Sequence, residues 1–200
     1  ASNINAPGIF GYKAQIPVEA YDPEGAKKLL AEAGYPDGFS LTIHGTNNRY
    51  INDDQVVQTV AQFLNRIGIR TRVDTQPVAT YFGKARAHEY SFALLGWGSL
   101  ATDFTLRSIV GTIDPDTGWG SWNWGKYSNP KVDELVAGAL AAVEPAERER
   151  LAREAASVAL GDLAVIPSHH QLATWGLRKG FAYDGRIDEF TFAHEIRSAR

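Results

Sequence analysis

Residues 21–39, YDPEGAKKLLAEAGYPDGF, contain the signals for both ends of a short helix and for the turn that follows it. Asp22 is a favourable N-cap residue, and Pro23 suits the first helical position, where a backbone N–H would have no partner within the helix. Gly34 supplies the left-handed conformation in which many helices end. The turn-forming residues 36–38 then redirect the chain. This stretch therefore predicts a helix, a tight turn and a new element after residue 38.

The chain then alternates between strand and helix patterns. Residues 39–43 alternate apolar and polar side chains, which is typical of a strand with one buried face. Asn52 or Asp53 is suited to cap a helix with a continuous apolar face, and Gly68 is suited to end it. Residues 69–74 alternate again. The order helix, strand, helix, strand predicts a parallel or mixed sheet covered by helices.

A strand that ends in a glycine-rich loop is expected next. After Pro77 a helix is expected over residues 78–87, and residues 90–95, YSFALL, then form a continuous apolar run. The length of this run is typical of a strand buried on both faces. The run ends in Gly-Trp-Gly at residues 96–98. Because ligands of open α/β sheets bind outside the C-terminal ends of strands, this loop is a candidate ligand site.

Tryptophans are concentrated just after this strand. Four of the five lie between Trp97 and Trp124, and residues 98–126 show neither a helical nor a strand period. Indole rings offer a large apolar area with one N–H donor and lose little rotamer entropy on binding. They suit a solute site, which needs aromatic surface and a few polar groups. The alternative is that they pack in a core beneath a long loop.

The C-terminal half predicts a pair of helices followed by short strands. Asn129 is expected to cap a helix that starts at Pro130, and a second helix with many charges is expected from Pro145. The two helices would form an αα-hairpin. Short strands are expected over residues 164–167, 171–175, 181–183 and 190–192. No domain boundary is expected within the chain.

The composition is that of an ordinary soluble globular protein, with 44% hydrophobic and 22% charged residues. The net charge of −3 gives no indication of a nucleic-acid partner or of an anionic membrane surface. No apolar run approaches the roughly 20 residues that span a bilayer. The absence of cysteine excludes disulfides and thiolate metal sites. Because the chain also lacks methionine, we expect a processed chain or a fragment of a longer protein.

Three stretches carry a resemblance to a known family: residues 21–39, LNRIGIRTRV at 64–73 and YSNPKVDELV at 127–136. They resemble the extracytoplasmic solute-binding proteins of ABC importers, of the family 5 type that binds peptides, nickel and opines. The resemblance implies an α/β fold, a lobe of a type II periplasmic binding protein with a mixed sheet, flanking helices and an αα-hairpin. It also implies that residues 1–200 are a single partial domain. That domain would be the C-terminal lobe of a larger two-lobed protein, with residues 165–200 reaching toward the missing lobe.

The resemblance also implies a function. Such a protein captures a small solute, a peptide or a peptide-like molecule, by closure of its two lobes, and membrane subunits of the importer recognise the closed form. It is not an enzyme and needs no cofactor or resident metal. Its place is extracytoplasmic, in the periplasm or at the cell surface, either soluble or lipid-anchored through the missing N-terminus, and its precursor carries a signal peptide.

Gly96 and Trp97 match the Gly-Trp strand end of the family's peptide-binding members, in which an Asp that pairs with the ligand's amino group follows closely. Here the third residue after Trp97 is Leu100, and the first carboxylate is Asp103. Asp103 either takes that role in a longer loop or caps a helix, or the ligand has no amine. Asn123 matches the family's Asn-x-Gly-x-Tyr-Ser-Asn-Pro stretch, with turn formation as the alternative. The candidate ligand-binding residues are Gly96, Trp97, Gly98, Asp103, Trp122, Asn123 and Trp124.

Two other classes of function stay open. No nucleophile elbow, phosphate-binding loop or paired-histidine zinc motif is present, and the best acid–base candidate is the pair His169 and His170. A hydrolase would need a site completed by the missing region. Exposed tryptophan and tyrosine side chains are equally used by protein-interaction domains. If the chain is instead a lobe of a solute-binding protein, it exposes apolar surface without its partner lobe, so we expect the isolated chain to self-associate as dimers or by strand exchange.

Overall fold

The computed structural model describes residues 1–12 and 20–199. Contacts between Cα atoms divide the chain into two compact units. Unit 1 contains the described residues of 1–17, 98–120 and 128–200, and unit 2 those of 18–97 and 121–127. Each unit is thus built from more than one stretch of the chain. The larger two-lobed architecture stays a prediction.

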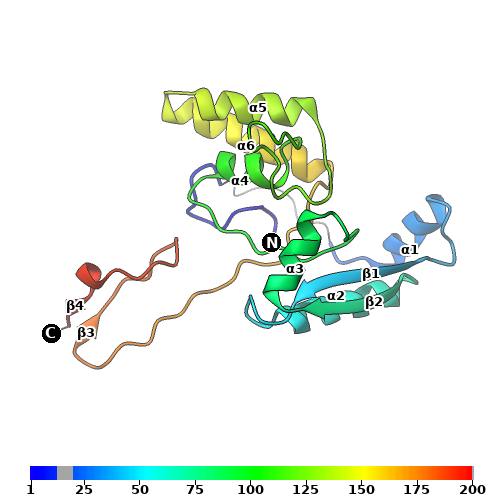
Figure 1. Ribbon diagram of the computed structural model, residues 1–200, viewed down its shortest axis with the longest axis horizontal. Helices are drawn as coiled ribbons and strands as arrows, with labels where there is room; N and C mark the ends of the chain where they lie inside the picture. Colours follow the sequence, from blue (N-terminus) through cyan, green and yellow to red (C-terminus); the bar gives the residue numbers. More distant parts are fainter. Residues whose placement is uncertain (13–19, 200) are drawn as a thin grey trace. The chain divides into compact units, whose positions relative to one another are not determined.

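Unit 2 consists of helices packed on a parallel pair of strands (Figure 1). The strands β1 (Ser40–Thr46) and β2 (Arg70–Gln76) pair in parallel, with Ser40 opposite Arg70 and Thr46 opposite Gln76. Helices α2 (Asp53–Arg66) and α3 (Val78–Arg86) contact both strands. Helix α1 (Pro23–Glu32) precedes β1. The predicted order of elements and their parallel pairing are confirmed.

The helix ends of unit 2 follow the sequence signals closely. The Asp22 side chain accepts a hydrogen bond of 2.8 Å from the backbone N–H of Gly25, which caps α1. Gly34 has a φ of +89°, and the N–H after it bonds to the carbonyl of Leu30, the pattern of a Schellman motif. Gly68, with a φ of +97°, ends α2 in the same way. These three signals therefore act as predicted, whereas Asn52, in the N-cap position of α2, makes no side-chain capping bond.

The core of unit 2 has two centres. In the first, Ile43 of β1 packs with Val57 and Ala61 of α2. In the second, Tyr81 and Ala85 of α3 pack with Tyr90. Helix α1 contributes no buried residue to either. Its Leu29 is 66% exposed, whereas Ala26 and Leu30 are half-buried.

The predicted strand over residues 90–95 is correct in place but wrong in extent. The segment runs parallel to β1 and forms one bridge, between His44 and Ala93. Two hydrogen bonds of 2.9 Å flank it, from the N–H of His44 to the carbonyl of Phe92 and from the N–H of Leu94 to the carbonyl of His44. In the described residues no strand pairs with its other edge. Residues 92–95 are accordingly half-buried, rather than buried on both faces.

Unit 1 is built on three helices: α4 (Thr102–Ile109), α5 (Pro130–Ala141) and α6 (Pro145–Gly161). Helices α5 and α6 lie side by side as the predicted αα-hairpin, and α4 packs against both (Figure 1). The side chain of Asn129 caps α5, accepting a 2.9 Å hydrogen bond from the N–H of Lys131. Helix α4 falls within a span where no element was predicted beyond the possible cap at Asp103, because its eight residues are too few to show a period.

The C-terminal segment differs most from expectation. Residues 162–180 contain no strand, so the strands predicted over 164–167 and 171–175 are wrong. The segment closes with a two-residue antiparallel pair, β3 (Phe181–Ala182) and β4 (Arg197–Ser198), and a 3₁₀ turn, η1 (Ala193–Glu195). The strand predicted over 190–192 is absent from the described structure. Within the described residues, no helix has both the length and the apolar character that a membrane crossing needs.

Candidate functional site

Three of the tryptophans gather in unit 2. The rings of Trp97 and Trp122 lie 5.4 Å apart between centroids, and those of Trp122 and Trp124 lie 5.7 Å apart. We call these three residues the indole cluster. The fourth tryptophan of the span, Trp119, belongs to unit 1, where its ring faces the guanidinium of Arg107 at 5.9 Å. The clustering expected from the sequence is therefore present for three of the four.

Helix α3 supports the indole cluster. The Phe82 ring lies edge-on to Trp122, with 5.7 Å between centroids, and the Tyr81 ring lies edge-on to Trp124 at 6.0 Å. The guanidinium of Arg86 sits 4.9 Å from the centre of the Trp122 ring, a cation–π contact. Tyr81 is fully buried, and its hydroxyl donates a 2.7 Å hydrogen bond to the carbonyl of Leu94. Side chains of α3 thus pack against two of the three indole rings, those of Trp122 and Trp124.

Two hydrogen-bond donors in the indole cluster have no acceptor. The Nε1 atoms of Trp97 and Trp124 are buried, and no described residue accepts a hydrogen bond from either. A buried donor without a partner costs about 1–3 kcal/mol, so such groups are rare unless a ligand or water satisfies them. The rings themselves are only half-buried. The cluster therefore combines aromatic surface with two unused N–H groups.

Asn123 holds the loop that carries two of the indoles. Its side-chain amide donates to the carbonyl of Tyr127 at 2.7 Å and accepts from the N–H of Tyr127 at 3.0 Å. The residue is buried, with 2% of its surface exposed. This pairing closes the turn between Trp122 and Tyr127, so the turn-forming role that the sequence allows for Asn123 is confirmed. A direct contact between Asn123 and a ligand stays a prediction.

A loop between β1 and α2 lies beside the end of the 90–95 segment. The Tyr50 ring packs against Gly96, and its hydroxyl donates a 3.2 Å hydrogen bond to the Gly96 carbonyl. The buried carboxylate of Asp53 organises this loop, accepting hydrogen bonds from the Thr46 hydroxyl at 2.6 Å and from the Tyr50 N–H at 3.1 Å. Burial alone would raise the pKa of Asp53. The hydrogen bonds that the carboxylate accepts outweigh burial, so the pKa of Asp53 lies below its usual value.

Sequence reasoning considered Asp53 only as a possible helix cap and overlooked Tyr50. The residue in the N-cap position of α2 is Asn52, which is left-handed and makes no side-chain capping bond. The available signal was an aromatic residue in a turn-rich loop at the C-terminal end of a strand.

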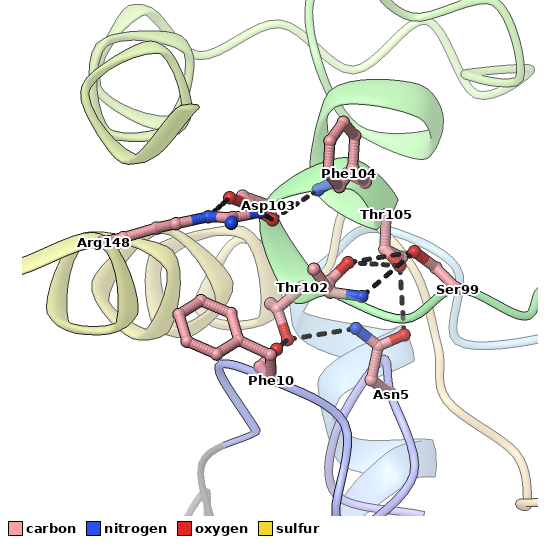
Figure 2. A network of polar contacts seen from close by, with 9 residues as sticks. Asn5, Phe10, Ser99, Thr102, Asp103, Phe104, Thr105 and Arg148 are labelled. Carbon is pink, nitrogen blue, oxygen red and sulfur yellow. Dashed lines mark hydrogen bonds and ion pairs between the residues drawn. The ribbon is translucent and has the colours of Figure 1, made fainter. Parts of the chain in front are cut away.

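Gly98 and Asp103 belong to unit 1. Asp103 is the second residue of α4, and Ala101 is in the N-cap position, so the alternative of Asp103 as the helix cap is wrong. Figure 2 shows Arg148 of α6 reaching the fully buried Asp103 carboxylate, with Nε donating at 2.6 Å and Nη2 at 3.2 Å. The Phe104 N–H donates a third bond, of 2.9 Å. These partners give Asp103 a structural role, and its pairing with a ligand amine stays a prediction.

The same region ties the N-terminal segment to α4. The Asn5 amide donates to the Thr102 hydroxyl at 3.0 Å and accepts from the Thr105 hydroxyl at 3.1 Å (Figure 2). The N–H of Thr102 donates to the carbonyl of Phe10 at 2.9 Å. These polar groups of Asn5, Thr102 and Thr105 thus find their hydrogen-bond partners within unit 1. They explain the start of α4, which the local sequence alone does not signal.

The remaining acid–base candidate, the pair His169 and His170, is not part of a recognisable catalytic arrangement among the described residues. His169 and His170 lie in the strand-free stretch 162–180, and Nδ1 of His169 lies 3.0 Å from the hydroxyl oxygen of Ser168. Burial lowers the pKa of His170, with the N-terminal amino group and His169 as smaller causes. Across residues 1–12 and 20–199, no three His, Asp or Glu side chains gather in a group able to hold a metal ion.

Comparison with known proteins shows a family to which the sequence is similar. Residues 1–106 match the model of the bacterial extracellular solute-binding proteins, family 5 Middle. The glutathione-binding protein GsiB of Salmonella paratyphi A is 34% identical over 175 residues, covering 84% of this chain and 33% of that protein. The heme-binding protein A of Haemophilus influenzae is 28% identical over 180 residues, covering 86% and 32%. The chain thus spans about a third of the length of these relatives.

Solved structures share the fold. HbpA2 from Haemophilus parasuis superposes with a TM-score of 0.87 at 21% identity, covering all of this chain and 40% of that one. The periplasmic binding protein DppA from Helicobacter pylori, in complex with the peptide STSA, gives 0.74 at 26% identity, covering 82% and 32%. The predicted fold class, an α/β lobe of the type II periplasmic binding protein kind, is confirmed. On the match over residues 1–106, the chain belongs to the bacterial extracellular solute-binding proteins of family 5.

Proposed function

We propose that the whole protein is the substrate-binding component of an ABC importer and captures a peptide or peptide-like solute by closure of two lobes. The family consists of solute-binding proteins rather than enzymes. Relatives named for binding glutathione and heme, and a similar structure that holds a peptide, support this class of cargo. An extracellular family also supports a place outside the cytoplasm, in the periplasm or anchored at the cell surface.

The observation that carries the proposal is the indole cluster with its two unpartnered N–H groups. Half-buried indoles contribute apolar area, and buried donors without acceptors are stabilised when a ligand supplies an acceptor. Both features suit a solute that presents a carbonyl or carboxylate oxygen next to an apolar or planar group. In this proposal Trp97, Trp122 and Trp124 contact the solute.

The other predicted contacts have different parts in the proposal. Gly96 and Gly98 would approach the solute through backbone atoms, since they have no side chain. Asp103 and Asn123 act mainly by holding the chain, because their oxygens already accept hydrogen bonds.

Replacement of Trp97 by Ala in the whole protein tests the proposal. A buried aromatic anchor is worth more than about 1.5 kcal/mol, so affinity should fall by more than about tenfold. Calorimetry with reduced glutathione, hemin and short peptides as probes measures this. Trp175→Phe is a matched control, because Trp175 lies in unit 1, where its Nε1 donates to the Thr191 hydroxyl. Unchanged affinity of the Trp97 variant for the probe that the wild type binds removes Trp97 from the site.

A further inference from the structure

Gly96 lies so close to the Tyr50 ring that a substitution at either position affects the other. A Cβ atom added at residue 96 would lie 2.5 Å from Cε1 of Tyr50 and 2.9 Å from its Cδ1 and Cζ. Carbon atoms do not approach so closely without a shift. The backbone of Gly96 is outside the left-handed region, so glycine is not needed there for its φ. A side chain at residue 96 would therefore collide with the Tyr50 ring.

The loop holds Tyr50 from both sides. Asp53 accepts a hydrogen bond from the Tyr50 N–H, and this carboxylate is 3% exposed at the start of α2. On the other side, the Asn48 side chain accepts a 2.9 Å hydrogen bond from the N–H of Val78, the first residue of α3. The loop is thus fastened to two helices of unit 2. The Tyr50 ring therefore has a fixed position rather than resting on the surface by chance.

The hydroxyl of Tyr50 acts on the peptide unit that carries Trp97. It donates to the carbonyl oxygen of Gly96, at 3.2 Å. This oxygen lies in the same peptide plane as the N and Cα atoms of Trp97, because the peptide bond is planar. Fixing the oxygen fixes the orientation of that plane. The direction in which the Trp97 side chain leaves the backbone is set by this plane together with the φ angle of Trp97.

We propose that Tyr50 is a positioning residue that sets the orientation of Trp97 in the indole cluster and thereby its contribution to solute binding. The part that concerns solute binding rests on the proposed function. The positioning itself rests only on the contacts of Tyr50 with Gly96. Gly96, in turn, is kept as glycine to accept the Tyr50 ring.

The test is a set of coupled substitutions, read first without ligand. The whole protein is labelled with 5-fluorotryptophan, and the ¹⁹F resonance of Trp97 is assigned from a Trp97→Phe variant. Tyr50→Phe removes only the hydroxyl and should shift the Trp97 resonance, while that of Trp175 stays in place. Gly96→Ala should shift the Trp97 resonance further in the presence of either aromatic ring. In the Tyr50→Ala background the added methyl group has room, so Gly96→Ala should cause little additional shift.

The same variants are then titrated with reduced glutathione, or with hemin if the wild type binds only that probe. Gly96→Ala should weaken binding by about tenfold in the wild type and in Tyr50→Phe, and by less than about twofold in Tyr50→Ala. Effects of Gly96→Ala that are equal in all three backgrounds overturn the proposal, even if Trp97→Ala abolishes binding and the proposed function stands. Background-dependent ¹⁹F shifts with unchanged binding in Trp97→Ala uphold the positioning and overturn the proposed role of Trp97 in binding.

Discussion

The contact between Arg148 and Asp103 provides the sharpest test of how unit 1 is held together. Asp103 is fully buried on α4, whereas 32% of the Arg148 side chain on α6 is exposed. The guanidinium also lies 4.9 Å from the centre of the Phe10 ring. Replacement of Arg148 by Gln keeps much of the aliphatic stem but removes both charged hydrogen bonds. The variant therefore leaves a carboxylate inside unit 1 with only the N–H of Phe104 as a described partner.

The magnitude follows from the burial of the two partners. Removing one member of a fully buried ion pair costs about 3–5 kcal/mol, because the other charge stays buried. The partial exposure of Arg148 means that water screens the pair and can reach the carboxylate in the variant. We therefore expect a loss of about 2–4 kcal/mol. On the same helix, Arg153 pairs with Glu149 at the surface, with side chains 45% and 37% exposed. Arg153→Gln should cost less than about 1 kcal/mol.

Native-state hydrogen exchange measures the loss where it arises. The amides of α4 in the Arg148→Gln variant should open with a free energy lower by about 2–4 kcal/mol. A double variant, Asp103→Asn with Arg148→Met, should recover most of this loss, because no unpaired charge remains. If Arg148→Gln lowers protection no more than Arg153→Gln does, the ion pair does not stabilise α4 and the structural role assigned to Asp103 is wrong.

Three further outcomes are expected. Burial lowers the pKa of His44, so as the pH falls the unfolded chain binds a proton on this side chain before the folded chain does. The free energy of unfolding should therefore decrease as the pH falls below about 6.5. His44→Gln should reduce the difference between the free energies of unfolding measured by urea titration at about pH 5 and about pH 8. Gly38→Ala would place a Cβ 1.9 Å from the carbonyl oxygen of Gly68, whereas a Cβ at Gly34, which is also left-handed, would have nothing within 4 Å. Gly38→Ala should therefore lower the melting temperature more than Gly34→Ala does, and equal decreases would contradict the clash. Exposed apolar side chains along residues 163–199 should make the 200-residue chain self-associate, and light scattering that shows a monomer at high concentration would exclude it.

The parts of the fold that follow from the sequence are those whose cause is local. An N-cap such as Asp22 needs only the N–H three residues ahead, and a terminator such as Gly34 needs only its own φ. The αα-hairpin after Asn129 depends on a cap, a proline and an apolar face, all within a few residues. These signals do not depend on what packs against the element. They act as predicted at Asp22 and Asn129, whereas Asn52 makes no side-chain capping bond and Asp103 is not the N-cap of α4.

Elements that depend on distant partners were predicted less well. The 90–95 segment has the composition of a central strand, but strand extent depends on a neighbour at each edge, and only β1 is present in the described residues. Helix α4 is short and is fixed by Asn5, about 100 residues earlier, and by Arg148, 45 residues later. Residues 164–175 have apolar side chains typical of strands, but without a strand beside them in the described chain they form none. Spacing along the sequence contains no information about such partners.

The candidate site illustrates the same division between side-chain type and environment. The gathering of Trp97 with its neighbours follows from composition, since indoles concentrated in one irregular span tend to pack together. The roles of the carboxylate side chains, in contrast, cannot be predicted from composition. Asp53 and Asp103 both lie in or near loops at strand ends, where a ligand contact is a natural expectation, yet each is buried and accepts three or more hydrogen bonds from the chain itself.

In the indole cluster, the buried groups without a partner among the described residues are donors, the N–H groups of Trp97 and Trp124. A ligand amine needs an acceptor, and these two acidic side chains have little accepting capacity left for one. A ligand oxygen needs a donor, and the indole cluster has two to offer. Together with the departure from the family's Gly-Trp-x-x-Asp spacing, this supports the proposal that the indole cluster binds the solute through its oxygen atoms and its apolar surface, rather than through an amino group.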